Sequence, residues 1–349
     1  MFDVAVIGAG PAGSLFAKRL GSHLKVALID KKSEEPDSFQ KPCGGLLAPD
    51  AQKALASLGL NLPKSVMVDP QIFSVRTVDL DSALTRNYQR MYINLDRHKF
   101  DLWLMSQIPE SVEKHFGCTV TSIEKTIAGY RVHYIENGMQ ESLEARTIVG
   151  ADGAKSIVRH YLYPKAKYRS YLSIQQWFSE SNPKPFCSCV FDSENTDCYS
   201  WSVSKDGYFI FGGAYETKNA REAFERQKKK LSAHGFVFGE AVRTEACTVM
   251  RPKSLSSFYC GKNNAFLIGE AAGFVSPSSL EGISSAIISA VRLSEIFNSG
   301  FGNKERAYRR ATAKLRMKLW LKLLKCPFMY NRLLRKIVLR LGIKSIEVE

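Results

Sequence analysis

Three glycines stand at a fixed spacing directly after the first apolar run of the chain. Residues 3–7 form that run, and the pattern G-x-G-x-x-G follows in Gly8, Ala9, Gly10, Pro11, Ala12 and Gly13. The first glycine of such a pattern permits a tight turn, the second lets the backbone approach a pyrophosphate, and the third lets a helix pack closely on a strand. A second apolar run over residues 24–30 ends at Asp30, an acid placed to bind a ribose hydroxyl. The chemistry indicated is the binding of a dinucleotide.

The elements that must position these residues are two parallel strands and a helix. Residues 3–7 and 24–30 lack alternation, which is typical of strands buried on both faces. Residues 14–21 read as the connecting helix, whose N-terminal N–H groups would face a phosphate. A glycine turn in another α/β domain is the alternative, but strand, glycines, helix, strand and acid all occur in register. Because an acid at Asp30 disfavours a 2′-phosphate, FAD or NAD is a better candidate than NADP.

Two later segments also place glycines and an acid directly after a predicted strand. A predicted strand over residues 143–149 runs into Gly150, Ala151, Asp152 and Gly153, where a carboxylate stands among glycines. An ordinary Asp-Gly turn is the alternative reading of that segment. A strand over residues 265–268 ends at Gly269 and Glu270, and Gly282 and Ile283 then open a helix of small residues over 283–291. The amides at the start of that helix would face whatever occupies the cleft.

A Cys-Gly-Gly triplet follows the first two strands. The adjacent glycines Gly44 and Gly45 let the backbone make a tight turn or pass close to a flat ligand. Cys43 is either an inert buried thiol or a group at that ligand. The eight cysteines are scattered without a C-x-x-C, and no histidine stands near Cys187 and Cys189, so no metal site is predicted. Reduced thiols and an N-terminus that is already a strand indicate a cytoplasmic protein.

Two more stretches carry candidate contacts. Paired strands are predicted over residues 71–95, and a helix begins near Arg97, which either reaches a phosphate or ring edge or is simply solvated. Residues 170–215 are rich in aromatic and β-branched residues and predict a mostly antiparallel sheet. Within it, Tyr199 and Trp201 share one strand face at period two. A strand that faces the protein core is the alternative.

The chain is basic, and its charge gathers at the C-terminal end. The 349 residues carry a net charge of +15, of which the 14 lysines and arginines and three glutamates of residues 301–349 contribute +11. Apolar positions in this segment fall on one helical face and lysines on another, as in helices that lie on anionic membranes. The alternative is a tail packed on its own protein. No apolar stretch reaches the roughly 18 residues needed to span a bilayer. Nucleic acid is not expected as a partner, because the tail's aromatic residues lie among its apolar ones.

The three dinucleotide segments together resemble flavoprotein monooxygenases and reductases of the p-hydroxybenzoate hydroxylase fold. Within that superfamily the chain is similar to the geranylgeranyl reductase family. Residues 41–45 look like the Cys-Gly-Gly motif that this family places beside the flavin. Residues 199–205 look like its lipid-pocket strand, Y-x-W-x-F-P-K, with Val203 and Ser204 in place of Phe and Pro. Glu270 stands where the family usually has Asp.

The resemblance covers nearly 300 residues and implies a fold and a site. The fold is α/β (α+β overall): a Rossmann-like FAD domain with a parallel sheet, an inserted antiparallel-sheet substrate domain and C-terminal helices. The expected boundaries are 1–70, 96–165 and 260–300 for the FAD domain, 71–95 and 166–259 for the substrate domain, and 301–349 for the basic helices. Tyr199, Trp201 and Lys205 are the implied substrate pocket. The implied FAD contacts are Gly8, Gly10, Pro11, Ala12, Gly13, Asp30, Lys31, Cys43, Gly44, Gly45, Arg97, Asp152, Gly153, Gly269, Glu270, Gly282 and Ile283.

The function implied is the FAD-dependent reduction of C=C bonds in a polyprenyl or isoprenoid lipid. Cys43 is the candidate for the proton donor or for a flavin-contacting group. A flavin monooxygenase or halogenase on an aromatic substrate, and a FAD-bound lipid-binding or regulatory protein with little turnover, are the alternatives. Only one dinucleotide fold is visible, so the electron donor is either NAD(P)H that binds transiently or a protein. The expected location is the cytoplasm, on the inner face of the cytoplasmic membrane through residues 301–349.

Overall fold

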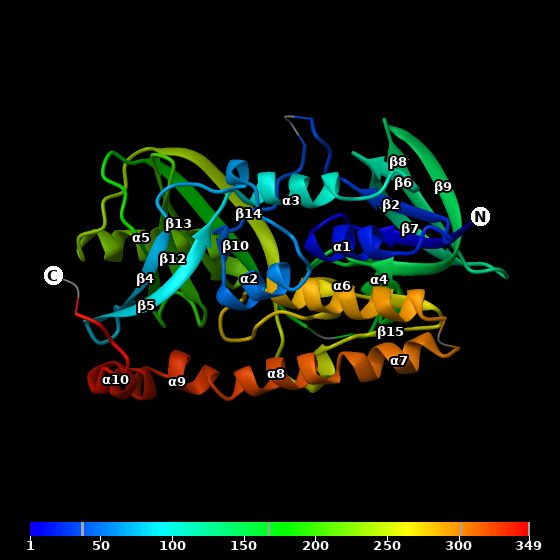
Figure 1. Cartoon of the computed structure of the whole chain (residues 1–349). Helices are drawn as coiled ribbons and strands as arrows, with labels where there is room; N and C mark the ends of the chain where they lie inside the picture. Colours follow the sequence, from blue (N-terminus) through cyan, green and yellow to red (C-terminus); the bar gives the residue numbers. More distant parts are fainter. Residues whose placement is uncertain (36–37, 167, 301, 348–349) are drawn as a thin grey trace. The chain divides into compact units, whose positions relative to one another are not determined.

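The chain folds into two compact units, each assembled from segments that are distant in the sequence. The computed structural model describes residues 1–35, 38–166, 168–300 and 302–347 (Figure 1). The first unit comprises Met1–Gln40, His98–Arg169 and Met250–Leu321, and the second comprises Lys41–Arg97, Ser170–Val249 and Lys322–Glu349. The predicted boundaries of a FAD domain and a substrate domain concern ligand binding and stay a prediction.

The first unit is built on a sheet whose central strands are parallel. Its order is β15-β16-β9-β1-β2-β6, in which the pairs β16–β9, β9–β1, β1–β2 and β2–β6 are parallel. The hairpin β7–β8 extends it through an antiparallel pairing with β9. The bounds are β1 (Phe2–Ile7), β2 (Val26–Asp30), β6 (Val112–Phe116), β7 (Thr119–Lys125), β8 (Tyr130–Glu136), β9 (Met139–Gly150), β15 (Gly261–Lys262) and β16 (Ala265–Leu267). All of β2 is buried, which confirms the predicted sheet with both faces covered.

Helices of the first unit pack on this sheet. They are α1 (Pro11–Arg19), most of α3 (Arg97–Ser106), α4 (Ile157–Leu162), α6 (Ile283–Asn298) and α7 (Lys304–Ala311). The first helix begins three residues earlier than predicted, because Pro11 fits the first turn of a helix. Its apolar face meets α6, where the rings of Phe16 and Phe297 lie 5.6 Å apart. The sixth helix continues to Asn298, seven residues beyond the predicted end.

The second unit contains a mostly antiparallel sheet, as predicted. Its order is β14-β10-β13-β12-β11-β4-β5-β3, and β11 and β4 pair in parallel. The strands are β3 (Leu46–Leu47), β4 (Ile72–Asp79), β5 (Leu84–Asn94), β10 (Arg169–Ser179), β11 (Phe186–Phe191), β12 (Tyr199–Lys205), β13 (Tyr208–Tyr215) and β14 (Ala241–Arg251). Helix α2 (Pro49–Ala56) follows β3 along the chain.

The two faces of the second sheet have different neighbours. Helix α5 (Ala220–Ser232) covers one face, where Phe224 packs in a cluster with Phe178 and Phe211. Ser200 of β12 points to this side and donates a hydrogen bond to the Gln227 side chain of α5. Because side chains alternate along a strand, Tyr199, Trp201 and Val203 belong to the opposite face. Val203 packs there with Ile72, Val75 and Ile210.

The basic tail forms several helices and not one continuous surface. Its helices are α7, α8 (Ala313–Leu323), α9 (Cys326–Tyr330) and α10 (Arg332–Leu341), while residues 301, 348 and 349 lie outside the described residues. Tyr308 of α7 is fully buried, and its hydroxyl donates to the Leu267 carbonyl 3.0 Å away. Tyr308 and Thr312 therefore anchor α7 and the residue after it to the core of the first unit. In the described parts of the chain, no helix has the length and apolarity to cross a membrane.

Candidate functional site

The glycine loop after β1 contains two glycines that the fold itself requires and one that leaves open space. Gly8 has a φ of +105°, and a Cβ there would lie 2.5 Å from the Ala151 carbonyl oxygen. A Cβ on Gly13 would overlap the carbonyl oxygen of Gly8. At Gly10 the nearest atom to an added Cβ is Lys32 Nζ, 4.0 Å away. The middle glycine thus keeps the backbone accessible, as a bound pyrophosphate needs.

The N-terminus of α1 faces the same loop. Gly10 is its N-cap and Pro11 its first residue, and among the described side chains none caps the helix or places an acid in its first turn. The N–H groups of the first turn and the helix dipole therefore favour an anion at this end. The loop and helix have the form of an anion-binding site for a dinucleotide phosphate.

Lys32 adds a buried cation that the sequence analysis missed. Its ammonium group pairs with Asp101 at 2.9 Å and lies 3.5 Å from the Ala9 carbonyl. Lys31, which was predicted to contact FAD, is exposed. Its ammonium group lies 3.3 Å from the centre of the Phe39 ring. Two lysines in succession give no sign of which one points inward, so only the structure could distinguish them. A cofactor role for Lys31 stays a prediction.

Asp30 holds the glycine loop in place. One carboxylate oxygen accepts a hydrogen bond from the backbone N–H of Ala9, and the other accepts one from the N–H of Lys32 at 2.6 Å. These contacts fix the turn on the carboxyl end of β2. A carboxylate has more lone pairs than these two bonds use, so the predicted bond to a ribose hydroxyl remains compatible with them.

The three predicted dinucleotide segments meet at the carboxyl edge of the parallel sheet. Gly150 pairs with Ile7 in one direction and with Leu267 in the other. A Cβ on Gly269, whose φ is +59°, would lie 3.0 Å from the Ala12 Cβ of the first helix. The segments around residues 8–13, 150–153 and 269–272 therefore form one continuous surface, which is where open α/β sheets bind ligands.

Asp152 presents an unsatisfied acceptor on that surface. Its Oδ2 accepts from the N–H of Ile157 at 2.7 Å, whereas its buried Oδ1 has no hydrogen-bond partner within the described residues. Burial raises the pKa of Asp152, and hydrogen bonds from Ser156 and the backbone of α4 oppose that rise. Since buried acceptors are normally paired, a ligand that carries hydroxyl groups would satisfy this oxygen.

Arg159 ties two of the segments together, although the sequence analysis gave it no role. Its buried guanidinium donates to the Ala271 carbonyl at 2.8 Å and to the Ala154 carbonyl. Glu270, in the same turn as Ala271, accepts from the backbone N–H of Met250 at 3.3 Å. Arg159 is therefore a positioning residue that joins the turn after β9 to the turn after β16.

Helix α6 supplies a second uncapped N-terminus in this unit. Gly282 is its N-cap and Ile283 its first residue, and no side chain of the described chain caps it. Gly282 has a φ of −130°, so its backbone conformation alone does not demand glycine. Space does not demand glycine either, because an added Cβ would make only ordinary van der Waals contacts, the nearest at 3.5 Å.

In the second unit, the Cys-Gly-Gly loop lies against the predicted substrate strand. A Cβ on Gly44 would come within 3.2 Å of Trp201 Nε1, and one on Gly212 of β13 would come within 2.8 Å of the same indole. The indole occupies space that these two glycines leave. Its Nε1 is buried and has no acceptor in the part of the chain that the structure describes. The Tyr199 ring meets it edge to face at 6.3 Å.

Lys205, at the end of the same strand, is buried beneath the loop. Its ammonium donates to the Asn94 side chain at 2.6 Å and to the Leu95 carbonyl at 2.7 Å, with the Gly45 carbonyl at 3.5 Å. Burial lowers the pKa of Lys205 to about 8, and the nearby Cys43, Asp96 and Asp206 side chains oppose this. The structure thus brings Cys43, Gly44 and Gly45 together with Trp201 and Lys205.

The remaining predicted contacts belong to the second unit or to its border. Arg97 is the first residue of α3 and is partly exposed, and its contact with a phosphate or ring edge stays a prediction. Cys43 is a partly buried free thiol whose Sγ accepts from the Gly45 N–H at 3.5 Å. Flavin contacts for the Cys-Gly-Gly residues likewise stay predictions.

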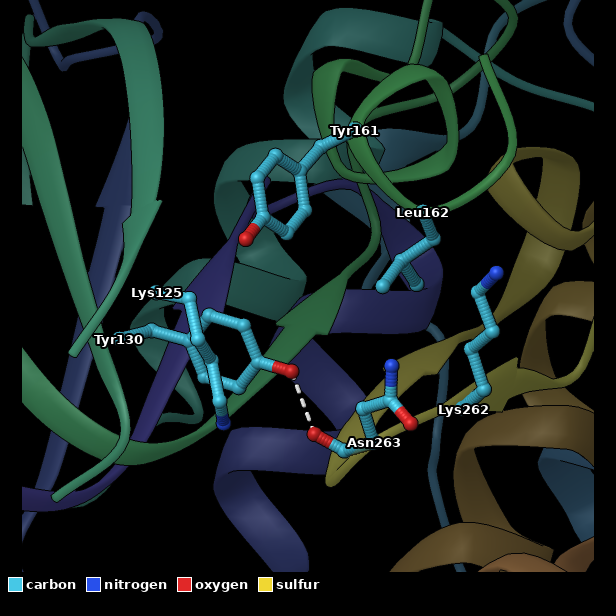
Figure 2. Close-up of a pocket in the computed structure, with 6 residues that line it drawn as sticks. All are labelled: Lys125, Tyr130, Tyr161, Leu162, Lys262 and Asn263. Carbon is cyan, nitrogen blue, oxygen red and sulfur yellow. Dashed lines mark hydrogen bonds between the residues drawn. The ribbon is translucent and has the colours of Figure 1, made fainter. Parts of the chain in front are cut away.

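A separate pocket of about 330 Å³ lies at the other end of the first unit's strands (Figure 2). Tyr130 at the start of β8 pairs with Ala145, which pairs with Phe2 at the start of β1. The Tyr130 hydroxyl donates to the Asn263 carbonyl across the pocket, and Lys125 Nζ lies 4.1 Å from the centre of the Tyr130 ring (Figure 2). This pocket is therefore distinct from the glycine loop, which follows the opposite ends of the strands.

Residues 1–301 match the sequence profile of a FAD binding domain. The chain belongs to the FAD binding domain family. Its cofactor is FAD, and the first unit fits that group at three points: the open backbone at Gly10, the uncapped start of α1 and the unpaired oxygen of Asp152.

Relatives of this FAD-binding protein extend along its whole length. Protein CbrA of Escherichia coli is 52% identical over 346 residues, which cover 99% of this chain and 94% of that protein. A geranylgeranyl bacteriochlorophyll reductase-like protein of Thermoplasma acidophilum has a similar fold, with a TM-score of 0.77, 17% identity and coverage of 97% of this chain and 90% of that one. PqsL, a probable FAD-dependent monooxygenase of Pseudomonas aeruginosa, gives a TM-score of 0.72 at 17% identity, with 98% and 99% coverage. The fold is thus shared by reductase-like and monooxygenase proteins, and it does not by itself select the reaction.

Proposed function

We propose that this FAD-dependent oxidoreductase reduces C=C bonds of a polyprenyl or other isoprenoid lipid at a membrane surface. The observation that carries the proposal is the packing of the Cys43–Gly45 loop against Trp201 and Lys205 within the second unit. Two sequence segments more than 150 residues apart, each similar to a motif of the geranylgeranyl reductase family, form one cluster. This cluster supports a joint role for them in substrate binding.

The side chains of the cluster suit an uncharged alkene. An isoprenoid offers no charge to bind, so its pocket needs apolar walls and few polar groups. Tyr199 and Trp201 supply aromatic surface, and the absence of side chains at Gly44 and Gly212 gives the indole the space it occupies. Bound FAD in its reduced form supplies the hydride. The tasks of the protein are to hold the alkene, exclude water and deliver a proton.

Cys43 is the proposed proton donor. Addition of a hydride to one alkene carbon requires a proton at the other, and the thiol would give its proton there and become a thiolate. Lys205 is close enough for the charges of the two groups to interact, so its ammonium would stabilise that thiolate. Solvent would then return the proton to sulfur. The reaction adds one hydride and one proton to each double bond.

The proposal includes a location on the inner face of the cytoplasmic membrane and an electron donor, either NAD(P)H or a protein. Apolar side chains of the tail that were expected on one face, Met317, Leu321 and Leu324, are each about half exposed, and lysines flank them. This arrangement supports contact with an anionic bilayer.

The test is an anaerobic turnover assay with purified, FAD-loaded protein. Chemically reduced enzyme is mixed with a geranylgeranyl lipid in anionic vesicles, and the product is analysed by mass spectrometry for two added hydrogens per reduced bond. Cys43→Ala should retain FAD and lose turnover, while Cys326→Ala, which alters a partly buried thiol of the tail, should retain both. Full reduction by Cys43→Ala would eliminate Cys43 as the donor, and no product with any isoprenoid would eliminate the function.

Monooxygenation or halogenation of an aromatic substrate is the second candidate, and the similarity in fold to PqsL favours it. Oxygen consumption in step with an aromatic substrate, without alkene reduction, would establish that reaction class. A FAD-bound regulatory protein with little turnover is the third candidate. It would be indicated by a flavin that neither NAD(P)H nor cellular protein donors reduce.

A further inference from the structure

Helix α10 buries an arginine and exposes several aliphatic side chains. Its arginine at position 335 is only 3% exposed, as is Leu339 one turn later. The aliphatic side chains of Leu333, Ile337 and Leu341 are instead 73%, 55% and 65% exposed. A surface helix normally buries its apolar stripe and exposes its charges. This helix instead buries Arg335 beside Leu339 and exposes three aliphatic side chains, so its outward face needs an explanation.

Two carboxylates of the same unit hold the helix in this orientation. The Arg335 guanidinium pairs with Asp79 at 2.9 Å and also with Asp81, and all three side chains are buried. It also donates to the Met329 carbonyl at 2.9 Å. Removal of one partner from a buried ion pair leaves an uncompensated charge and is strongly destabilising. Arg335 therefore acts as a clamp at the end of β4.

Backbone contacts with β5 fix the helix further. Arg86 donates from Nε to the Leu339 carbonyl at 3.0 Å, and the N–H of Ile346 donates to the Asn87 carbonyl at 2.8 Å. With the clamp, these bonds hold both the helix and the segment that follows it. The helix cannot rotate to bury its stripe without breaking them.

The exposed stripe has cations along one edge. Leu333, Ile337 and Leu341 follow at intervals of four residues, so they lie on one helical face. Lys336 and Arg340 lie beside it, and neither forms an ion pair with any carboxylate in the described ranges. Phe328 of α9 and Leu324 before it are also more than half exposed, which extends the apolar character of this part of the unit.

We propose that α10 lies in the headgroup layer of an anionic bilayer, with this stripe inserted and Arg335 clamped to Asp79 and Asp81. An apolar stripe with a cationic edge matches acyl chains beneath anionic headgroups. The net charge of +11 in residues 301–349 favours that surface over an uncharged one. The inference rests on the membrane location in the proposed function but not on its reductase chemistry. It assigns one helix and one helical face to the membrane contact that the proposed function gives to the tail.

The test is co-sedimentation of the full-length FAD-loaded protein with phosphatidylcholine vesicles that contain or lack phosphatidylglycerol. Ile337→Glu/Leu341→Glu should reduce the affinity for the anionic vesicles by about tenfold or more, because two exposed apolar contacts are lost. Val237→Glu changes a side chain that is 83% exposed elsewhere in the same unit and should leave binding unchanged. Equal binding by the double variant would overturn the proposal. So would a wild-type dimer that the double variant dissociates while vesicle binding persists.

The clamp is tested by hydrogen exchange. Arg335→Met should raise the exchange rate of amides 332–341 by about tenfold or more, because it leaves the buried Asp79 carboxylate without its cation and removes one of the two arginines on Asp81. Arg340→Met removes an exposed arginine of the same helix and should change exchange little. Unchanged protection in Arg335→Met would overturn the clamp. Turnover of the wild type is measured separately. Alkene reduction by a wild-type protein that does not bind anionic vesicles would contradict this inference alone, and vesicle binding without turnover would contradict only the reductase.

Discussion

The indole of Trp201 lies directly against the backbone of Gly44. A Cβ at Gly44 would come within 3.2 Å of Trp201 Nε1, which is closer than an ordinary van der Waals contact. The glycine of the Cys-Gly-Gly loop thus sets the position of an aromatic ring on β12. This contact gives a structural reason for a glycine at the second position of the triplet, which the sequence alone does not provide.

Gly44→Ala should therefore displace the indole without unfolding the protein. The expected results are a changed tryptophan fluorescence spectrum and a turnover reduced by about tenfold, since small displacements in a site have large kinetic effects. Gly239→Ala is the matched control, because no atom lies within 4 Å of a Cβ there. An unchanged spectrum together with full turnover in Gly44→Ala would show that the contact has no role.

Gly10 and Gly13 should respond differently to the same substitution. Gly10→Ala should leave the apoprotein within about 1 kcal/mol of the wild-type stability and weaken FAD binding by about tenfold or more, because the methyl group enters space meant for the pyrophosphate. Gly13→Ala should lower the unfolding free energy of the apoprotein several times more than Gly10→Ala does, because its Cβ would overlap the Gly8 carbonyl. Urea unfolding of the apoproteins and FAD titration separate the two effects. Equal FAD affinity in Gly10→Ala would contradict the assigned phosphate position.

Lys205 should make the unfolding free energy rise with pH in the alkaline range. Its folded-state pKa, about 8, lies below its unfolded value, so the unfolded state binds more protons and stability rises with pH between the two values. Between pH 7 and 9.5 the wild type should gain about 2 kcal/mol relative to Lys205→Met, from 1.36 kcal/mol per pH unit above the folded pKa. Denaturant unfolding of both proteins at the two pH values measures the difference, and a constant difference would argue against a depressed pKa.

Arg159→Met should weaken FAD binding because the arginine joins the turn after β9 to the turn after β16. The substitution leaves the Ala271 and Ala154 carbonyls without their buried donor, which should cost about 2–4 kcal/mol of unfolding free energy. FAD content should fall as well, because the two turns that the arginine joins both border the cofactor surface. Arg131→Met removes an exposed pair with Glu144 and should cost less than about 1 kcal/mol. Similar losses in both variants would refute the special role of Arg159.

The convergence of the three glycine segments could be predicted because parallel strands bring distant turns to one edge. Once residues 3–7, 143–149 and 265–268 were read as strands, the glycine segments after them had to converge. The contact between Gly44 and Trp201 is different, because it joins a loop and a strand that are far apart in the sequence and follows only from packing. Lys32 and Arg159 were missed for the same reason: their roles depend on which way a side chain points after a strand or along a short helix.

The tail shows how periodicity can mislead. The sequence predicted a tail whose apolar residues share one helical face and whose basic residues share another. In the structure Arg335 is buried against Asp79 and Asp81, so it is removed from that face. A helical pattern identifies which residues share a side but not which side is turned inward. In α10 the inward side is set by Asp79 and Asp81, two carboxylates more than 250 residues away in the sequence.

Asp30 has a further consequence through its two backbone bonds. Its carboxylate accepts hydrogen bonds from the N–H groups of Ala9 and Lys32, so contacts within the chain itself hold the glycine loop in shape. The entropic cost of shaping the loop is then absent from the binding step, which favours tight capture of the dinucleotide. The emptied protein should accordingly be a rigid receptor, able to take up fresh FAD rapidly without refolding.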